Sequence, residues 1–403
     1  MSQHDRDRLK VISRVCSGDL SLRHGSELLG LSYRQASRLL GRYRAEGDIG
    51  LIHRGRGQES NRKISASVRE QIIALLREHY SDYGPTLASE ILDERHQIKI
   101  SRETLRGWMS EAGLWRSKSR KVKHRRWRER RACFGELVQM DTSEHDWLEG
   151  RGEKLYLISM IDDATSRLFA RFYPSDSTVN NMDLLKRYIR RHGRPMSLYT
   201  DKASHFKYNG AVDIEHQLSG ELPRTQIGRA LNALGIELIW ANSPQAKGRV
   251  ERQFGTLQDR LVKRLRLEGV SDLIGANECL DRYLIPFWNK RFSVEAQNKT
   301  NLHRRLDGLS LDHIFSVHEK RTVANDYTFS LNGDRYQIAS CRVAPGLRGG
   351  KILVESWLNG RVKASFRGEY LSIKKLSKPV PRRAGYSKPG PSVAAVEGGP
   401  DCA

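Results

Sequence analysis

The segment that most constrains the fold runs from residue 236 to residue 265, where a strand-like run leads into a long helical pattern. Pro244 suits a position just ahead of a helix, because its ring fixes φ and it has no N–H to donate. The apolar residues that follow recur at the spacing of one helix face and are Val250, Phe254, Leu257, Leu261 and Leu265. Glu251 lies one residue, about 100° of helix rotation, from this stripe, so its carboxylate borders the packed face.

Three basic residues, Lys247, Arg249 and Arg252, surround Glu251. An acid in this setting suits either a salt-bridged surface helix or a site for metal ions and phosphate. The segment alone favours the surface helix. Only partner acids elsewhere in the chain would support the metal site.

The chain as a whole is strongly basic. Its 70 Lys and Arg residues against 47 Asp and Glu give a formal net charge of +23, which favours a polyanionic partner, nucleic acid before a membrane surface. No stretch approaches about 18 consecutive apolar residues, and residues 1–7 lack the apolar core of a signal peptide, so we expect no membrane contact. The five cysteines are scattered without a C-x-x-C pair, which indicates reduced thiols in a cytosolic compartment and argues against a cysteine-based zinc site.

The N-terminal 52 residues have the pattern of a helix-turn-helix unit. A helix over 6–17 is followed by a short helix capped by Ser21, with Leu22, Leu28 and Leu29 on one side, and Gly30 supplies the turn. Ser32 caps the next helix, whose outer face carries Arg34, Gln35, Arg38 and Arg42. This face suits the major groove of DNA, and the alternative is a helical hairpin with a solvated face.

A second helical unit and a basic linker follow. Helices are predicted over 66–79, 86–95 and 102–113, with Arg102 and Arg106 facing outward on the last, where base contact and a purely structural role are equally supported. Residues 54–57 (RGRG) form a basic stretch expected to lie along the DNA backbone. The linker 116–131 has ten Lys or Arg residues against one Glu, and its phosphate contacts are expected from Lys121, Lys123, Arg125, Arg126 and Arg128. The alternative is a solvated linker.

From residue 133 onward the pattern predicts a mixed sheet in the order βββαβαβα. The first strand ends at Asp141, the second spans 155–161 and the third 168–173, and a helix spans 178–192. The fourth strand, 196–200, is followed at once by Asp201. A helix over 225–234, the strand 236–240 and the helix of Glu251 complete the order.

Two of these strands therefore end in aspartates. If the first and fourth strands are adjacent and parallel, Asp141 and Asp201 lie side by side at one edge of the sheet. Two carboxylates ~4 Å apart repel by about 4 kcal/mol at an effective dielectric of 20, so they need protons or cations. Oxygen-only ligands suit Mg²⁺ or Mn²⁺, and a third carboxylate on a neighbouring helix would complete a two-metal site for phosphodiester chemistry.

These residues resemble the integrase core of DDE transposases, and most closely the ISNCY group of bacterial insertion-sequence transposases. The resemblance covers residues ~10–375 and is carried by the order Asp141, Asp201, Glu251, by residues 161–167 (IDDATSR) and by 242–252 (NSPQAKGRVER). It implies an RNase H-like fold that uses two divalent metal ions to cut DNA and transfer its 3′ end. By position, the three acids are the catalytic metal ligands, and Lys247 and Arg252 are phosphate contacts.

The chain departs from that family in three places. Positions 202–250, 49 residues, separate the second and third acids, and the surplus falls in the polar loop 207–224. Lys202-Ala203 replaces the usual asparagine-glycine pair after the second aspartate. The Cys/His zinc-binding head of retroviral integrases is absent, and the helix-turn-helix unit takes its place.

Other acids and histidines compete for a role near the site. Asp162 and Asp163 end the second strand, where a turn role, capping their own backbone, is favoured. Glu144 and Asp146 suit a surface loop. His145 and His205 flank the proposed ligands and suit the surface or a supporting position better than metal ligation.

The C-terminal region changes from helices to hairpins. Residues 271–320 are predicted as a helical connector with Tyr283, Phe287 and Trp288 as packing anchors. Two Asn-Gly pairs, at 332–333 and 359–360, lie between alternating runs and predict hairpins of a small β-barrel over 321–376. Such a barrel resembles the C-terminal barrel of transposases and integrases, and this resemblance implies that it supports DNA and subunits. The alternative is a barrel that only packs on the core. Residues 377–403 have the composition of a disordered tail.

The sequence thus predicts a multidomain α/β protein that acts on double-stranded DNA as a transposase. The expected domains are 1–52, 62–115, the linker 116–132, the catalytic core 133–270, the connector 271–320, the barrel and the tail. Two element ends must be held together, so a dimer or larger assembly on DNA is expected, in the bacterial cytoplasm and associated with the nucleoid. The alternatives are a DNA-binding repressor or architectural protein with a silenced core, and a simple RNase H-like nuclease.

Overall fold

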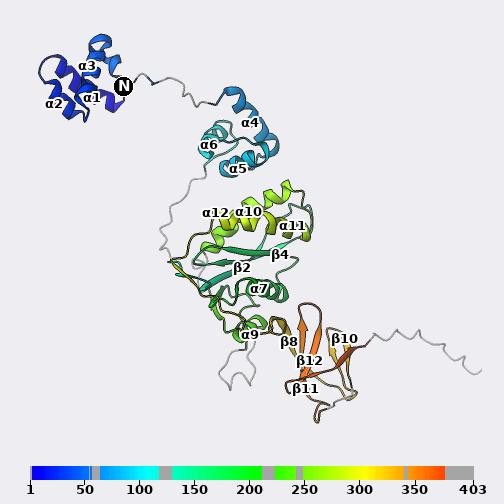
Figure 1. Ribbon diagram of the computed structural model, residues 1–403. Coiled ribbons are helices and arrows are strands. Elements are labelled where there is room, and N and C mark those ends of the chain that lie inside the picture. The colour runs from blue at the N-terminus through cyan, green and yellow to red at the C-terminus, as the bar shows by residue number, and fades with distance from the viewer. Residues whose placement is uncertain are drawn as a thin grey trace, which may run out of the picture. The chain divides into compact units, whose positions relative to one another are not determined.

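The computed structural model describes two compact units, residues 1–122 and 123–403 (Figure 1). The described residues are 2–53, 55–56, 64–117, 129–210, 223–241, 248–339 and 344–376, without the side chains of 248–252. None of the helices in these ranges is long and apolar enough to cross a membrane.

The first helical unit has the predicted helix-turn-helix order. It comprises α1 (Gln3–Cys16), α2 (Leu22–Leu28), α3 (Tyr33–Glu46) and a 3₁₀ turn, η1 (Gly47–Leu51). Ser21 and Ser32 cap α2 and α3 as predicted, and Gly30 adopts a φ of 62° in the turn. The first helix begins earlier than predicted, because Ser2 and Asp5 form a capping box.

One packing prediction in this unit is wrong. Leu28 was placed on the inner side with Leu22 and Leu29, but its side chain is 58% exposed. Leu22 and Leu29 are seven residues apart and share a face, whereas Leu28 is rotated by about 100° from Leu29. The two in-phase leucines pack beside the core of Ile12, Leu39 and Leu40.

The second helical unit comprises α4 (Ala66–His79), α5 (Pro85–His96) and α6 (Arg102–Glu111). Its buried residues include Ile72, Leu76, Leu92, Leu105 and Met109. That helix ends two residues before the predicted boundary at 113, because Gly113 has a φ of 73° and turns the chain.

The central sheet confirms the predicted order of strands and helices. Its strands are β2 (Leu137–Glu144), β3 (Tyr156–Asp162), β4 (Leu168–Tyr173), β5 (Ser197–Thr200) and β6 (Glu237–Trp240), arranged β4-β3-β2-β5-β6. The pairs β2–β3 and β3–β4 are antiparallel, and β2–β5 and β5–β6 are parallel. The main helices between and after them are α7 (Thr178–His192), α9 (Gln226–Ala233) and α10 (Gly248–Leu267).

Helices cover both faces of this sheet, which explains the continuous apolar run of β3. Ile158 and Met160 pack with α7 and α9 on one face. Leu157 and Ile161 pack on the other face with α10, α11 (Leu273–Cys279), the π-turn η3 (Leu280–Leu284) and α12 (Ile285–Arg291) (Figure 1). The segment predicted as a connector therefore contributes helices to the layer over the sheet.

Two asparagines hydrogen-bond to the backbone of the outer strand β4. Asn277 accepts from the Phe172 N–H at 2.9 Å and donates to the Phe172 carbonyl at 3.1 Å. Asn289 makes the same pair of bonds with Leu168, at 2.8 and 3.1 Å. Backbone groups that an edge strand would leave open are thereby satisfied by side chains of α11 and α12.

The C-terminal strands form two small sheets around one core. One contains β8 (Ser316–Thr322), β11 (Lys351–Trp357), β12 (Val362–Phe366) and β13 (Glu369–Leu371), in the order β13-β12-β11-β8. The other contains β9 (Thr328–Leu331), β10 (Asp334–Ile338) and β14 (Ile373–Lys375), in the order β14-β10-β9. Both sheets contribute to a common apolar cluster.

The two predicted Asn-Gly hairpins are confirmed. Asn332 and Gly333 adopt φ of 49° and 80°, and Gly360 adopts 82°. A barrel is not confirmed, because the described strands do not join into one hydrogen-bonded sheet. Residues 377–403, the predicted tail, lie outside the described residues, and the predicted domain boundaries remain predictions.

Two further short elements complete the described chain. β1 (Cys133–Phe134) pairs in parallel with β7 (Asn298–Asn301), which links the start of the core to the segment after α12. The one-turn helix α13 (Leu311–Ile314) packs its apolar residues with α7 and α9.

The β4 edge gives a stability prediction. Replacing the buried Asn277 with Ala leaves the N–H and carbonyl of Phe172 without their partner, and each buried unsatisfied group costs about 1–3 kcal/mol. We expect the melting temperature of the full chain to fall by several degrees in Asn277→Ala. The matched control is Asn232→Ala, at an exposed residue of α9, where the free energy of unfolding should change by no more than about 0.5 kcal/mol. Equal melting temperatures for the two variants would contradict the role of Asn277.

Candidate active site and DNA-binding surfaces

Asp141 and Asp201 are placed by two parallel strands that pair in register. Leu137 to Gln139 of β2 lie opposite Ser197 to Tyr199 of β5, and two more steps along this register bring Asp141 opposite Asp201. Both acids are half-buried. The predicted adjacency of the first and fourth strands is therefore confirmed, although β2 does not end at Asp141 as predicted and continues to Glu144 along β3.

Local backbone groups orient both carboxylates. The N–H of Thr142 donates to Asp141 Oδ1 at 3.1 Å, and the N–H of Ala203 donates to Asp201 Oδ1 at 2.9 Å. Ala203 belongs to the pair that replaces asparagine-glycine after the second aspartate. Its N–H holds the aspartate as an Asx-type turn does, a bond that any residue other than proline can make.

A histidine–aspartate pair lies behind these acids. His205 Nε2 is 3.4 Å from Asp176 Oδ2, and the Asp176 side chain also accepts from Thr142 Oγ1 at 3.2 Å and Asn181 Nδ2 at 2.7 Å. Because Thr142 follows Asp141, the pair connects the ends of β2 and β5. The sequence predicted a supporting or surface position for His205 but missed Asp176, which lies in the loop before α7 and has no motif around it.

The negative charge of Asp176 and the positive charge of protonated His205 stabilise each other. The hydrogen bond to Asp176 raises the pKa of His205 above its ordinary 6.5, against the effect of burial, and the negative charges of Asp176 and Asp201 add to the rise. Burial acts to raise the pKa of Asp176, but the hydrogen bonds from His205 and Asn181 lower it overall.

Glu251, the third proposed ligand, lies in the first turn of α10, and its side chain is outside the described residues, as are those of Lys247 and Arg252. The helix itself is anchored where the sequence predicted. Phe254, Leu257, Leu261 and Leu265 are buried as one stripe. Gln258 donates to Ser143 Oγ of β2 at 3.2 Å, which fixes α10 two residues past Asp141. Glu251 precedes Gln258 by seven residues, about two turns of α10.

The competing acids are structural. Asp162 accepts from the N–H and hydroxyl of Thr165 in its own turn and from the Gly135 N–H, and burial raises its pKa. Asp163 reaches beyond its turn: it accepts from the Arg131 N–H at 2.9 Å and from Gln139 Nε2 at 2.6 Å. Asp162 therefore has the predicted turn role. Asp163 instead accepts hydrogen bonds from residues outside its turn.

The remaining polar residues around Asp141 also have ordinary roles. Glu144 is exposed and pairs with Lys154, and exposed Asp146 accepts from the Gly150 N–H. His145 packs edge-on against the ring of Trp147.

The outer face of α3 carries exposed Arg34 and Arg38 and half-buried Arg42. Gln35 is also exposed, but its Oε1 accepts from the Ser32 N–H at 3.1 Å and closes the capping box. A spacing of three from Ser32 could have signalled this role.

The other predicted DNA contacts lie in different surroundings. Arg102 and Arg106 are exposed on α6, and Arg106 pairs with Glu103. Arg56, expected on the DNA backbone, forms an ion pair with the buried Asp5 of α1. The five predicted linker contacts, Lys121, Lys123, Arg125, Arg126 and Arg128, lie outside the described residues.

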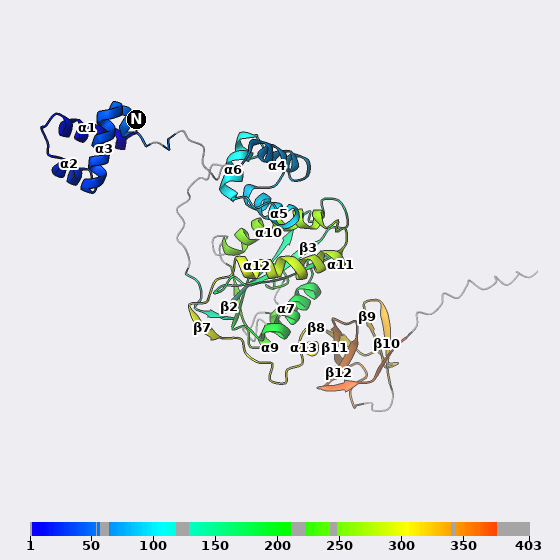
Figure 2. The ribbon, with the colours of Figure 1, turned by 45° about the horizontal axis from the view of Figure 1, so that its top comes forward.

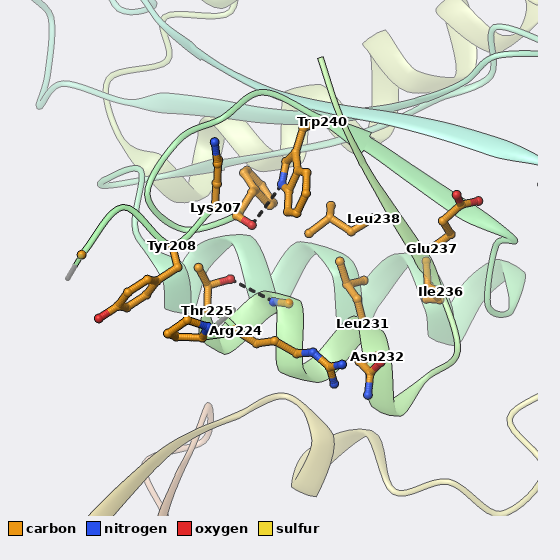
Figure 3. Close-up of a pocket in the computed structure, with 14 residues that line it drawn as sticks. Lys207, Tyr208, Arg224, Thr225, Leu231, Asn232, Ile236, Glu237, Leu238 and Trp240 are labelled. Atoms are coloured by element: carbon orange, nitrogen blue, oxygen red, sulfur yellow. Dashed lines mark hydrogen bonds between the residues drawn. The ribbon is translucent and has the colours of Figure 1, made fainter. Parts of the chain in front are cut away.

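A pocket of about 610 Å³ lies between α9, β6 and the loop that follows Asp201 (Figure 3). Leu231, Ile236 and Leu238 form its apolar wall, and Lys207 and Arg224 also line it. The indole of Trp240 donates to the Phe206 carbonyl at 3.2 Å, which ties β6 to this loop. Neither Asp141 nor Asp201 lines the pocket, and no pattern in the sequence indicates it.

Comparison with known proteins agrees with this architecture. Models of a helix-turn-helix domain match residues 7–58, of a homeodomain-like domain 35–109 and of an integrase core domain 132–238. The chain is 40% identical over 382 residues to y4bF of Sinorhizobium fredii, whose name assigns it as a candidate transposase, and the match spans 94% of this chain and 82% of that protein. The chain belongs to the DDE transposases.

A second relative is the transposase of the insertion sequence IS1202 from Streptococcus pneumoniae, 29% identical over 72% of this chain and 68% of that protein. Among solved structures, the simian T-cell lymphotropic virus intasome aligns with 77% of this chain and all of that chain, at 12% identity and a TM-score of 0.32. The HTLV-2 integrase core with magnesium aligns with 42% of this chain and 96% of that chain, at 16% identity and a TM-score of 0.28. The family assignment therefore rests on the sequence relatives.

With the integrase core and the two helix-turn-helix matches, the protein is a DNA-binding transposase of the polynucleotidyl transferase class. The repressor alternative is not favoured, because both relatives are named as transposases. A simple nuclease is equally disfavoured, since the DNA-binding units precede the core.

The His205–Asp176 pair gives a pH prediction for the transposase. A histidine with a raised pKa stabilises the fold below its ordinary pKa of 6.5, and that contribution is lost as the pH rises through the raised value. An aspartate with a lowered pKa stabilises above 3.8 and loses this contribution as the pH falls. The pair therefore stabilises most between these two values. In Asp176→Asn we expect the pKa of His205, measured from its NMR shifts, to fall toward 6.5. A pKa of His205 that stays unchanged in this variant, as it should in Asp183→Asn, would contradict the pairing.

Proposed function

We propose that Asp141, Asp201 and Glu251 are the catalytic metal ligands of this transposase, and that it cleaves the ends of a mobile DNA element and joins their 3′ ends to target DNA. The observation that supports this best is the parallel, in-register pairing of β2 and β5, which brings two aspartates from distant parts of the sequence to one sheet edge. Glu251 is the acid of the motif 242–252, in the first turn of the helix that is anchored to β2.

The donor set fits Mg²⁺ or Mn²⁺, because it consists of carboxylate oxygens without cysteine or histidine ligands. Three carboxylates suit two ions per site. When bound, such ions activate a water or 3′-hydroxyl and stabilise the leaving oxygen of a phosphodiester.

The residues of the chain supply orientation and charge. The N–H groups of Thr142 and Ala203 each hold one carboxylate oxygen, which limits the rotation of both aspartates. The His205–Asp176 pair braces the ends of the two strands. Lys247 and Arg252 flank Glu251 in the sequence and are proposed to contact the phosphates of the DNA.

The helical units are proposed to recognise the element ends. The N-terminal arginines of α3 read the major groove, and the basic linker 116–132 contacts phosphates. Joining requires two ends in one complex, so we propose a dimer or larger assembly on double-stranded DNA, acting on the bacterial nucleoid in the cytoplasm. Membership of the ISNCY group is part of the same proposal.

Strand joining tests the catalytic proposal. We expect the wild-type protein, incubated with its own terminal DNA, a target plasmid and Mg²⁺, to form joined products. Asp141→Asn, Asp201→Asn and Glu251→Gln should lose joining by about a thousandfold or more while they retain DNA binding, since each removes one ligand charge without changing side-chain size.

Matched controls sharpen this experiment. Glu144→Gln and Asp146→Asn alter exposed acids within five residues of Asp141 and should retain full joining. Full activity in any of the three ligand variants would refute the assignment of that residue. Binding without joining by the wild-type protein would favour a repressor.

DNA recognition by α3 gives a separate prediction. A base contact by an arginine is worth about 1–3 kcal/mol, so Arg38→Ala should weaken binding to the element end by roughly 5- to 150-fold. Binding of this variant to unrelated DNA should change much less. The ratio of the affinities for the element end and for unrelated DNA, measured by gel shift at fixed salt, should therefore fall. Arg14→Ala, an exposed arginine of α1, is the control and should bind as the wild type does. An equal loss on both DNAs in Arg38→Ala would indicate a phosphate contact in place of a base contact.

A further inference from the structure

A second group of metal-binding side chains lies far along the chain from the catalytic acids. It consists of His313 at the end of α13, His318 on β8 and Glu355 on β11, and their donor atoms all lie within 4.8 Å of one another. His318 and Glu355 are direct cross-strand partners, so their side chains project from the same face of the sheet. α13 lies next to β8 and β11, which brings His313 to this face (Figure 2).

Glu355 is a buried, charged carboxylate. Its residue is 1% exposed, and its oxygens are bonded to His313 Nδ1 at 3.0 Å, Trp357 Nε1 at 3.1 Å and Tyr370 Oη at 3.2 Å. Burial acts to raise the pKa of Glu355, but the hydrogen bonds from His313 and Trp357 lower it overall. A buried carboxylate that stays ionised is a strong ligand for a cation.

The two histidines differ in exposure. His318 is half-buried on β8, directly opposite Glu355 of β11. Its Nε2 is held 3.0 Å from Ser316 Oγ. The side chain of His313 is 45% exposed, which leaves an entry path from solvent.

We propose that His313, His318 and Glu355 form a binding site for a transition-metal cation with the ligand preference of Zn²⁺. Two imidazoles and one carboxylate are an established zinc donor set, with water or a fourth side chain completing a tetrahedron. Tyr370 Oη, 3.3 Å from His313 Nδ1, is placed at this fourth position. Zinc bonds of ~2.1 Å need donors ~3.4 Å apart, so the exposed His313 ring closes the remaining gap by rotation.

The guanidinium of Arg229 is a positive charge close to the proposed site. It donates to the carbonyls of Ile314 at 2.9 Å and Ser316 at 2.6 Å, so its hydrogen bonds are directed at the backbone between α13 and β8. The bound ion would take the place of the hydrogen bond between His313 and Glu355, and Arg229 would keep its own contacts. The positive charge nearby predicts a weaker site than one lined by acids alone.

The site lies where the C-terminal sheets meet the catalytic core. Leu311, Ile314 and Phe315 of α13 pack in the core cluster with α7 and α9, and Gln226 of α9 hydrogen-bonds both the N–H and the carbonyl of His318. A metal bound by His313, His318 and Glu355 would join α13, β8 and β11 and fix the C-terminal sheets to the core.

Zinc binding by the full chain tests this proposal. Zinc is titrated in excess Mg²⁺, which occupies oxygen-rich sites, and the wild-type chain should bind one zinc ion at this site. In His318→Ala and His313→Gln the zinc affinity should fall by more than about tenfold. Loss of a residue that only hydrogen-bonds to a metal ligand already lowers metal affinity by this much. Co²⁺ should give tetrahedral visible bands that both variants lose. His24→Ala, an exposed histidine of α2, and Asp141→Asn should bind as the wild type does.

Zinc should also raise the melting temperature of the wild type more than that of the two variants. Far-UV circular dichroism checks folding, and if His318→Ala fails to fold, the half-exposed His313→Gln decides alone. Equal zinc affinity in wild type and His313→Gln, or no zinc binding and no cobalt bands in the wild type, would overturn the proposal and leave a hydrogen-bonded network only.

Discussion

The structure depends on the parallel pairing of β2 and β5. A shift of one residue in this pairing would turn one of the two aspartates to the opposite face of the sheet, because side chains alternate along a strand. The register is enforced by burial on the face that α7 and α9 cover, where Val138, Met140 and Leu198 are fully buried. The hydrophobic core that makes the sheet stable is thus also what sets Asp141 opposite Asp201.

Polar contacts extend this control to both ends of the sheet. At the end of β2 away from Asp141, the carboxylates of Asp162 and Asp163 accept hydrogen bonds from the N–H groups of Gly135 and Arg131 and from the side-chain amide of Gln139. These bonds fix the path by which the chain enters β2. At the outer edge, Asn277 and Asn289 occupy backbone groups of β4. Each contact joins residues distant in sequence. Together they leave the strand ends near Asp141 and Asp201 as the part of the sheet directed at a ligand.

How far the sequence predicts this structure follows from the range of each interaction. The strand order, the α10 stripe and the Asn-Gly hairpins are encoded by periodicity and turn chemistry within short windows, and all are confirmed. The extension of β2 to Glu144, the asparagine contacts on β4 and the pairing of Asp176 with His205 depend on partners between 12 and 121 residues away, so no local pattern indicates them. The barrel is not confirmed for the same reason: hairpins are local, whereas closure of a sheet is not. The roles of Asp141, Asp201 and Glu251 remain predictions supported by the placement of two of them.

The charges on the helical units show why net charge alone overstates a DNA-binding surface. Arg56 is neutralised by the buried Asp5, whose own pKa is lowered by the hydrogen bonds from Ser2 and Arg56. Arg69 and Arg106 pair with Glu111 and Glu103 on or beside α6. An arginine held by a buried carboxylate cannot also release a counterion from a phosphate, so it contributes nothing to the salt dependence of DNA binding. The slope of affinity against salt should therefore reflect the exposed arginines of α3 and the basic linker, and be much smaller than the net charge of +23 would suggest.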